Sequence, residues 1–463
     1  MFAHPDVARE LDYETLNQIF TFWTAVSPAT AFRGISELPP GHSMRVSQQG
    51  TSVWPYWQID YSADAEGKDD ALAEELLAML TDAVRLRLRS DVTVGAYLSG
   101  GLDSSFIAAL INKVSPERLH TFSIGFADSA FDESQFQEEC SLFLGTKHER
   151  ICCSAQDIQR VFPEVVQHAE TPILRTAPAP LFLLSKLVRD SGIKVVLAGE
   201  GADELFGGYD IFKEAKVRRF WAAQPNSHLR PILLRKLYPY LARLQAQPDS
   251  YLREFFHIQN RGLFFSHQPR WDLTSRLKVF LSPAVQVPDA YKRMEAALPV
   301  NYSRWDAFSQ AQYLETAHLL PGYILSSQGD RMAMAHSVEQ RFPFLDHRVV
   351  TFASRLPAKL KMKVLNEKFL VKRAATGLIP QQILKRSKQP YRAPEADCFF
   401  KPVPSEYIQE MLSPDRIRRN GIFDPRPVEM LLKKFRDRTA SAARDTMALT
   451  GILSTQILID KFL

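Results

Sequence analysis

Residues 92–105, VTVGAYLSGGLDSS, decide the fold that the sequence predicts. The alternating apolar side chains of residues 92–98 predict a buried parallel strand, and the segment that begins at Asp103 and continues as FIAALI predicts a helix. Between them, Gly100 and Gly101 let the backbone turn so that successive N–H groups point at one place, where the following helix adds its positive end. This turn is therefore a candidate phosphate cradle.

Side chains of the same turn add polar groups to the cradle. The hydroxyls of Ser99, Ser104 and Ser105 are donors for phosphate oxygens, and Asp103 is placed to hold a Mg²⁺ ion that neutralises a polyphosphate. The turn lacks the lysine of the GxxxxGK[ST] pattern and does not fit GxGxxG either. A plain flexible turn is the alternative, because glycine turns between a strand and a helix are common.

A second glycine turn follows another apolar run. Residues 194–205 have the sequence KVVLAGEGADEL, in which Glu200, Asp203 and Glu204 are carboxylates. In open parallel sheets, ligands bind outside the carboxyl ends of the strands. Two strands that each end in a glycine turn with acidic groups predict one nucleotide site that is closed from both sides.

Strands and helices are predicted to alternate through this part of the chain. Such alternation is typical of an α/β fold with a doubly wound parallel sheet. Beyond Tyr209 the strand signals fade, and mostly helices separated by prolines are predicted. The predicted strands are residues 92–98, 119–126, 147–152 and 194–198, and the predicted helices follow Asp103 and lie near residues 133–144 and across residues 158–189.

The composition limits the class of protein. A chain of 463 residues with 45% hydrophobic residues is long enough for two domains and a large core. Its net charge of +5 is small for this length, which argues against a nucleic-acid surface. Four cysteines without CxxC spacing, no basic-then-apolar leader and no apolar run of bilayer length predict a cytoplasmic protein that contacts no membrane.

Residues 1–60 differ in character from the rest. A short helix at residues 12–23 and an alternating hairpin at residues 42–47 and 51–57 are predicted there. An isolated hairpin is only marginally stable in water, so we expect it to pack on another surface. The predicted domains are residues 1–60 and residues 61–463, the latter with a nucleotide-binding core at about residues 70–210 and a helical part at about residues 211–463, joined through a polar linker at residues 60–70.

Four motifs in order carry a resemblance to a known family. SGGLDSS resembles the signature of the ATP pyrophosphatase fold. Together with GEGADELFGGY at residues 199–209, DRMAMAHSVEQRFPFLDH at 330–347 and KRSKQPYRAPE at 385–395, it resembles the synthetase domain of glutamine-dependent asparagine synthetases. The resemblance runs from about residue 70 to the C-terminus. It implies an amino-acid biosynthetic ligase that uses ATP and Mg²⁺ to adenylate a carboxylate, with L-aspartate as the first candidate, and forms an amide with ammonia.

The resemblance also implies roles for individual residues. Asp103 and Asp203 would be Mg²⁺ ligands, although Asp203 is also suited to cap the helix that follows it. Glu200 matches a glutamate thought to act as general base on ammonia, and Lys388 matches a lysine aimed at the phosphates. The adenine would lie against the backbone at Leu98, Ile124, Ala198 and Gly199, of which the first three are equally explained as strand core.

Two arginines are weaker candidates for binding an anion. Arg175 would bind the pyrophosphate, and Arg331 would bind the substrate carboxylate, because arginine forms bidentate pairs with both groups. The segment FPFLDH at residues 342–347 is expected to be a packing element behind the site.

Residues 1–60 resemble the last portion of the glutaminase domain of the same family. There the nucleophile is a cysteine directly after the initiator methionine, whereas here Phe2 stands at that position and no cysteine precedes Cys140. The start is therefore expected to be trimmed, or the protein lacks its own glutaminase. It would then use free ammonia or a separate glutaminase subunit docked on the hairpin of residues 38–57, unless that surface contacts a second copy in a homodimer.

Three further hypotheses stay open. An amide ligase of secondary metabolism that acts on another carboxylic acid would have the same motifs. An inactive partner subunit would be expected to have lost some of Asp103, Asp203, Glu200 and Lys388, which are all present. A sulfur-transferring relative that acts on tRNA would be expected to show cysteine spacing and a basic surface.

Overall fold

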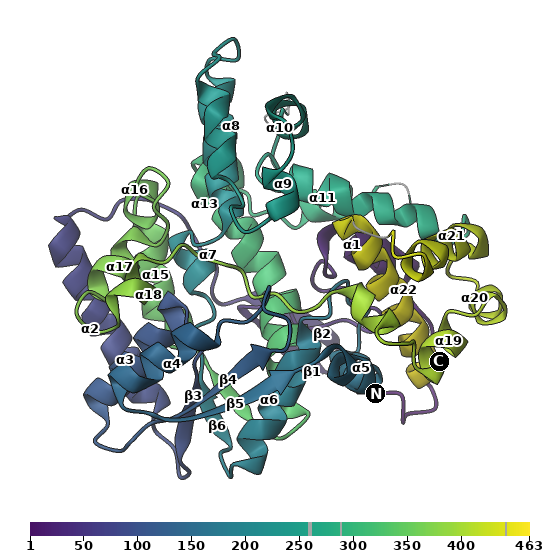
Figure 1. The fold of residues 1–463 in the computed structure, drawn as a ribbon, viewed down its shortest axis with the longest axis horizontal. Coiled ribbons are helices and arrows are strands. Elements are labelled where there is room, and N and C mark those ends of the chain that lie inside the picture. The colour runs from purple at the N-terminus through teal and green to yellow at the C-terminus, as the bar shows by residue number, and fades with distance from the viewer. Residues whose placement is uncertain (258–261, 288, 440–441) are drawn as a thin grey trace.

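The computed structural model describes residues 1–257, 262–287, 289–439 and 442–463. Its centre is a five-stranded parallel sheet in the order β5-β4-β3-β6-β7, which confirms the predicted α/β class (Figure 1). The strands that follow β3 are added on one side of it and β6 and β7 on the other, so the carboxyl ends of β3 and β6 mark the topological switch point. The strands are β3 (Val94–Tyr97), β4 (His120–Phe126), β5 (Lys147–Cys153), β6 (Val195–Leu197) and β7 (Glu339–Arg341).

The edge strand β7 was not predicted, because strand signals fade beyond Tyr209. Its sequence is only EQR, without an apolar side chain. Backbone hydrogen bonds hold it beside β6, from Glu339 N to the Lys194 carbonyl at 2.8 Å and from Ala198 N to the Arg341 carbonyl at 3.0 Å. Short, charged strands are typical of sheet edges, where they discourage pairing with other chains.

Helices cover both faces of the sheet and make two hydrophobic cores. On one face Tyr97 of β3 packs in a core with residues of α5 and α6, and on the other face Ala96 of β3 packs with those of α2 and α3. Alternate residues of β3 therefore point to opposite cores, as a strand requires. These helices and their neighbours are α2 (Asp69–Arg87), α3 (Leu102–Val114), α4 (Ser134–Leu144), α5 (Ala155–Ala169), α6 (Pro178–Asp190) and α7 (Ala202–Phe206).

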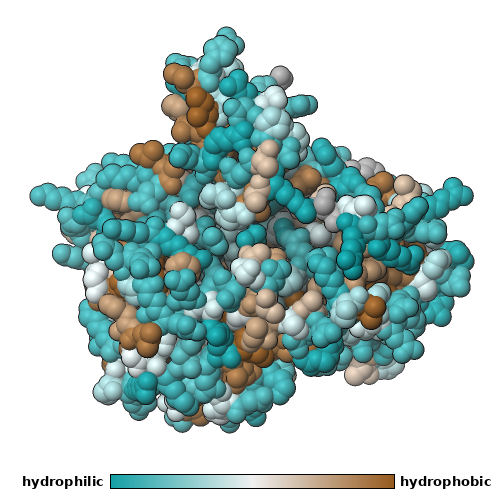
Figure 2. Space-filling view, viewed as in Figure 1, coloured by the Kyte–Doolittle hydropathy of each residue, from teal (hydrophilic) through white to brown (hydrophobic). Residues whose placement is uncertain are grey.

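The part after α7 is mostly helical, as predicted. Figure 1 shows α8 and α10 standing out from the body, and Figure 2 shows hydrophobic side chains gathered on this protrusion. The helices are α8 (Asp210–Ala222), α9 (Ala242–Gln245), α10 (Asp249–Phe256), α11 (Gln268–Ser275), α12 (Tyr291–Ala296), α13 (Ala307–Leu314), α14 (Arg331–Met334), α15 (His347–Arg355), α16 (Ala358–Lys361), α17 (Phe369–Ala374), α18 (Gln381–Lys385), α19 (Glu406–Met411), α20 (Pro414–Asn420), α21 (Pro425–Arg436) and α22 (Ala443–Phe462).

A long π-helix, η4 (Glu315–Asp330), connects α13 to α14 and packs against α6 and α7. π-Helices are rare and occur mostly as single turns, often at functional sites. Here Pro321 lies inside the helix, and a Cβ at the next residue, Gly322, would lie 2.1 Å from Thr24 Oγ1. The missing side chain therefore lets the N-terminal segment approach the centre of the molecule.

The N-terminal segment has one buried and one exposed part. Helix α1 (Tyr13–Phe22) is capped by Asp12, whose side chain accepts a hydrogen bond from Thr15 N. The helix is buried along most of its length. Strands β1 (His42–Ser47) and β2 (Gly50–Pro55) form the predicted hairpin, but β2 is exposed throughout, so the expected packing surface is not provided by the described residues. Within those residues, no helix is both long and apolar enough to cross a bilayer.

Candidate active site

Hydrogen bonds between its own residues fix the shape of the glycine turn after β3. Ser99 N donates to Ser104 Oγ at 3.0 Å, and the two serine hydroxyls lie 2.9 Å apart. Gly100 has a φ of +74°, and a Cβ there would lie 2.8 Å from Phe136 Cβ, so both the backbone and the packing require glycine. These contacts fix the shape of the SGGLDSS turn, and its role as a phosphate cradle stays a prediction.

The two glycine turns touch each other. Because β3 pairs directly with β6, their carboxyl ends are neighbours. A Cβ at Gly199 would lie 2.9 Å from Ser104 N and 3.0 Å from Asp103 Cβ. The first turn of α3 and the loop after β6 thus lie in contact at the switch point, and that they form one nucleotide site stays a prediction.

The two predicted metal ligands come together around two lysines. Lys368 Nζ lies 2.5 Å from an oxygen of Asp103 and 2.5 Å from an oxygen of Asp203. Lys388 Nζ lies 2.6 Å from Asp203 and 3.8 Å from Asp103. Burial by itself would raise the pKa of Asp203, but the two ammonium groups outweigh it and hold that pKa below its usual value.

Lys368 was not found in the sequence analysis. Its side chain is fully buried, and it has a positive φ of 52° at the start of α17. A Cβ at Gly208 would lie 1.9 Å from Asp203 Oδ1 and 2.2 Å from Lys368 Cε, so this glycine makes room for the ion pair. The only sequence signal is a lysine directly before the apolar run FLV, which is too common to indicate a site.

The donor set suits a magnesium ion. Mg²⁺ is usually held by one or two carboxylates together with phosphate oxygens and water. Asp103 and Asp203 supply two carboxylates, and Asp103 Oδ1 is buried without a hydrogen-bond partner. Among the described residues, no group of three or more His, Cys, Asp or Glu side chains forms a metal site, so any magnesium here would depend on phosphate and water for its other ligands.

Glu200 has the properties of a proton acceptor near neutral pH. Burial raises its pKa to about 7; the carboxylates of Asp103 and Asp203 act in the same direction, and Lys388 opposes them. Its Oε2 atom is buried without a hydrogen-bond partner. An unpaired carboxylate oxygen beside the phosphate cradle is available to a ligand.

A second carboxyl group next to the site is held by a buried network. Burial and the charge of Asp203 raise the pKa of Glu204 to about 8, and the Tyr209 hydroxyl donates to Glu204 at 2.7 Å. Gln312 donates to the Glu204 carbonyl at 2.8 Å and accepts from Lys361 at 2.8 Å. These bonds fix α7, the helix that carries Asp203.

The remaining residues predicted for the nucleotide lie at the same edge of the sheet. Leu98 follows β3, Ile124 lies in β4 and Ala198 follows β6, and all three are buried. Ser105 lies in the first turn of α3, where its buried side chain interacts with the Cys140 thiol. Contact of these residues with an adenine stays a prediction.

The structure does not place Arg175 and Arg331 with the charged residues of the two glycine turns. The Arg175 guanidinium pairs with Glu395 and stacks on Trp23, with its Cζ atom 4.9 Å from the ring centroid. Arg331 pairs with Glu170 at 2.6 Å and donates to the His168 carbonyl at 3.2 Å. Both guanidinium groups thus already have protein partners, and their anion-binding roles stay predictions.

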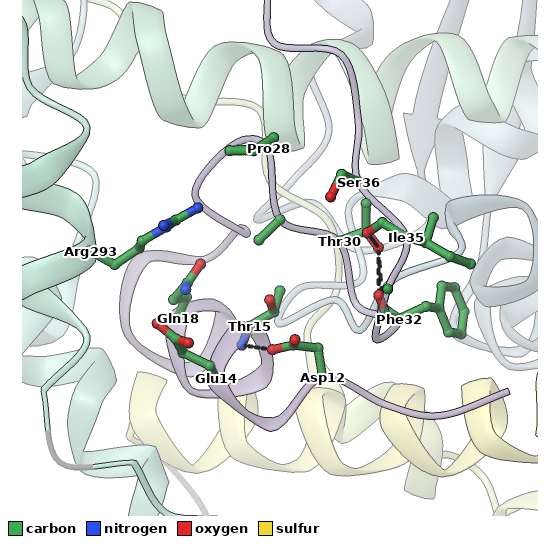
Figure 3. A pocket seen from close by; sticks show the side chains of 12 residues that line it. Asp12, Glu14, Thr15, Gln18, Pro28, Thr30, Phe32, Ile35, Ser36 and Arg293 are labelled. Carbon is green, nitrogen blue, oxygen red and sulfur yellow. Dashed lines mark hydrogen bonds between the residues drawn. The ribbon is translucent and has the colours of Figure 1, made fainter. Parts of the chain in front are cut away.

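A cavity of about 190 Å³ lies elsewhere, between α1 and the loop at residues 28–36 (Figure 3). Three of its polar side chains bind the protein itself: Asp12 caps α1, Gln18 accepts from Val26 N, and Thr30 donates to the Ile35 carbonyl. The cavity contains none of the residues of the two glycine turns. This cavity is therefore not a candidate for the chemistry.

A parallel sheet with a phosphate cradle and paired acidic turns at its switch point defines a nucleotide-binding α/β protein. Comparison with known families gives the particular one: residues 75–460 match the model of the asparagine synthase family, and the chain belongs to that family. It is a family of ATP-dependent amide ligases.

Individual relatives are distant. The chain is 29% identical over 399 residues to asparagine synthetase (glutamine-hydrolyzing) 1 of Bacillus subtilis, which covers 85% of this chain and 61% of the relative. It is 31% identical over 401 residues to a putative asparagine synthetase (glutamine-hydrolyzing) of Mycobacterium tuberculosis, covering 83% and 58%. Amidase chry2 of Gibberella zeae is 27% identical over 441 residues, covering 86% and 64%. The chain thus spans less than two thirds of the length of these relatives.

Proposed function

We propose that the protein adenylates a carboxylic acid with ATP and transfers the acyl group to ammonia, releasing AMP and pyrophosphate. The observation that carries this proposal is the group formed by Asp103, Asp203, Lys368 and Lys388 beside Glu200. It combines a charge-balanced phosphate site with a carboxyl group that titrates near neutral pH. L-Aspartate is the first candidate for the acid.

The proposed reaction has two steps. A carboxylate oxygen attacks the α-phosphorus of ATP, and the bond to the pyrophosphate oxygen breaks. Ammonia then attacks the acyl carbon, AMP leaves with the bonding electrons, and a proton passes from nitrogen to Glu200. Mg²⁺, when bound by Asp103 and Asp203, would neutralise the charge of the departing pyrophosphate.

The lysines and the fold supply the rest of the chemistry. Lys388 lies at the acidic pair with its side chain 25% exposed, so it can reach phosphate oxygens on which charge develops. Lys368 is too deeply buried to do so and instead holds Asp103 and Asp203 in place. The helical part of the chain would limit access of water to the reactive acyl group.

ATP–pyrophosphate exchange across a panel of carboxylic acids tests the proposal and names the substrate. L-Aspartate is expected to support exchange that depends on ATP and Mg²⁺. The fungal relative named an amidase has an identity similar to that of the synthetases, which favours a second candidate, an amide ligase for another acid. Exchange with a different acid would support that candidate, and exchange with no acid would favour an inactive partner subunit.

The source of ammonia is a second part of the proposal. Glutamine hydrolysis needs a reactive nucleophile such as a thiolate. Burial raises the pKa of Cys140 to about 11 and that of Cys153 to about 12, so neither is suited to this role. We therefore propose that the chain uses free ammonia or the product of a separate glutaminase subunit.

The hairpin is the proposed docking surface for such a subunit. Large apolar side chains lie exposed on and beside both strands, and exposed strand edges readily pair with other chains. These side chains are Leu38, Met44, Val46, Val53, Trp54, Tyr56 and Trp57. With ATP, Mg²⁺ and aspartate, the isolated chain should form amide from ammonium but not from glutamine. Amide from glutamine with an equal amount of glutamate would reveal a glutaminase centre in this chain.

A further inference from the structure

A strap of irregular backbone, residues 386–395, carries Lys388 across the front of the site. It leaves the end of α18 and crosses the molecule toward α19 (Figure 1). At its far end Glu395 pairs with Arg175 and accepts from the Thr446 hydroxyl. Without regular secondary structure, the strap depends on side-chain contacts for its position.

Arg386 makes the contacts at the near end of the strap. Its guanidinium pairs with Glu133, donates to the Gly100 carbonyl at 3.4 Å and lies with its Cζ atom 4.1 Å from the centroid of the Phe136 ring. The side chain is only 16% exposed. One planar group is thus engaged by a carboxylate, a backbone carbonyl and an aromatic face, a combination that lysine cannot reproduce.

The Gly100 carbonyl belongs to the phosphate cradle. The Gly100 C=O and the Gly101 N–H are parts of one planar trans peptide and point in opposite directions. A donor that holds the carbonyl outward therefore keeps the N–H directed inward, where it donates to Ser99 Oγ at 3.3 Å. Arg386 thus acts on the orientation of a cradle N–H that it does not touch.

The same stretch of strap also fixes Lys388. The Lys388 backbone N–H donates to Glu367 at 3.0 Å, two residues after the Arg386 contacts. Glu367 is itself held by Lys213 at 3.0 Å and Lys372 at 3.2 Å. The start of the strap is therefore tied to the glycine turn on one side and to α17 on the other.

We propose that Arg386 is a positioning residue that latches the strap onto the glycine turn, and that this latch sets the affinity of the site for a nucleoside triphosphate. The ATP part of the inference rests on the proposed function. Neither the family match nor the names of the relatives assign a role to Arg386. Its effect is exerted through Gly100 and Lys388.

Binding of ATP with Mg²⁺ to the full chain, measured by calorimetry without acid substrate, tests the latch. Arg386→Ala should weaken binding about tenfold or more, because a charged hydrogen bond and an ion pair are lost together. Arg386→Lys should also bind ATP weakly, because lysine keeps the positive charge but lacks the planar guanidinium group. Arg392→Ala is the matched control on the same strap, where Arg392 stacks on Phe131 and Tyr240, and it should bind as the parent does.

Limited trypsin digestion gives a second readout that needs no ATP. Arg386→Ala should speed cleavage after Lys388 several-fold relative to the parent, whereas Arg392→Ala should not. Parent-like ATP binding and cleavage in Arg386→Ala would overturn the latch, as would equal effects of both variants. A parent chain that binds no ATP would refute the proposed function, and the digestion would still decide whether Arg386 holds the strap.

Discussion

Lys368→Met removes the buried cation that joins the two acidic turns while keeping the length of the side chain. Lys368 Nζ is 2.5 Å from both Asp103 and Asp203, and Lys388 approaches Asp103 only to 3.8 Å. Lys388 keeps Asp203 paired at 2.6 Å, so Asp103 is the carboxylate that is left without a close partner. Removing one partner of a buried ion pair typically costs about 3–5 kcal/mol, because the remaining charge has lost both water and its partner. We expect a loss of that size in the free energy of unfolding at pH 7.

Urea unfolding of the parent and the variant measures this loss. Lys372→Met is the matched control: it removes one buried contact of Glu367, but Lys213 keeps that carboxylate paired, so it should cost less than about half as much. Lys368 helps to lower the pKa of Asp203, so its contribution is present above the ordinary aspartate value of 3.8 and fades as the pH falls below it. A Lys368→Met protein within about 1 kcal/mol of the parent at pH 7 would refute the argument.

Further predictions concern the chemistry. Chromatography of spent nucleotide should show AMP, and ADP as the main product would contradict adenylation. Lys388→Ala and Asp103→Ala should each lower pyrophosphate exchange on the order of 10² to 10³-fold, and exchange within a few-fold of the parent would exclude the tested residue from the reaction. Because the pKa of Glu200 is raised to about 7, amide formation at a fixed concentration of neutral ammonia should rise with pH around that value, and Glu200→Gln should abolish this rise. Gly208→Ala should displace the ion pair and lose exchange. Gly192→Ala strains the backbone at a φ of +80° by about 1–2 kcal/mol, but its Cβ meets no atom within 4 Å, so it should retain exchange.

The sheet could be predicted from the sequence where strands are apolar runs. Residues 119–126 and 147–152 correspond closely to β4 (His120–Phe126) and β5 (Lys147–Cys153). Strand β4 is buried throughout, as a central parallel strand requires. Strand β5 is a partly exposed edge strand with the sequence KHERICC, so the alternation of strands and helices contributes to its prediction. Strand β7 has no such requirement: it pairs on one side only and has a polar sequence, so its place is set by β6 and not by its own side chains.

The candidate site could be predicted where its residues lie in the glycine turns, and at Lys388 only through the resemblance of the KRSKQPYRAPE motif. Asp103, Asp203 and Glu200 are fixed by strand ends, which periodicity and turn chemistry locate. Lys368 reaches the same point through tertiary packing of α17, and no local pattern distinguishes it from a surface lysine. Arg331 shows the converse, because a residue in a recognisable motif pairs with Glu170 instead of joining the acidic turns.

The four charged residues Asp103, Asp203, Lys368 and Lys388 lie far apart in the sequence, and this has a consequence for the synthesis of the chain. Asp103 and Asp203 emerge from the ribosome long before Lys368, which follows Asp103 by 265 residues. Domains generally fold from the N-terminus as they are made, but here the early part would bring two carboxylates together with no cation between them. The nascent sheet is therefore expected to stay open at its switch point until the last quarter of the chain arrives. If the protein has the proposed function, a partly translated chain would not be able to consume ATP.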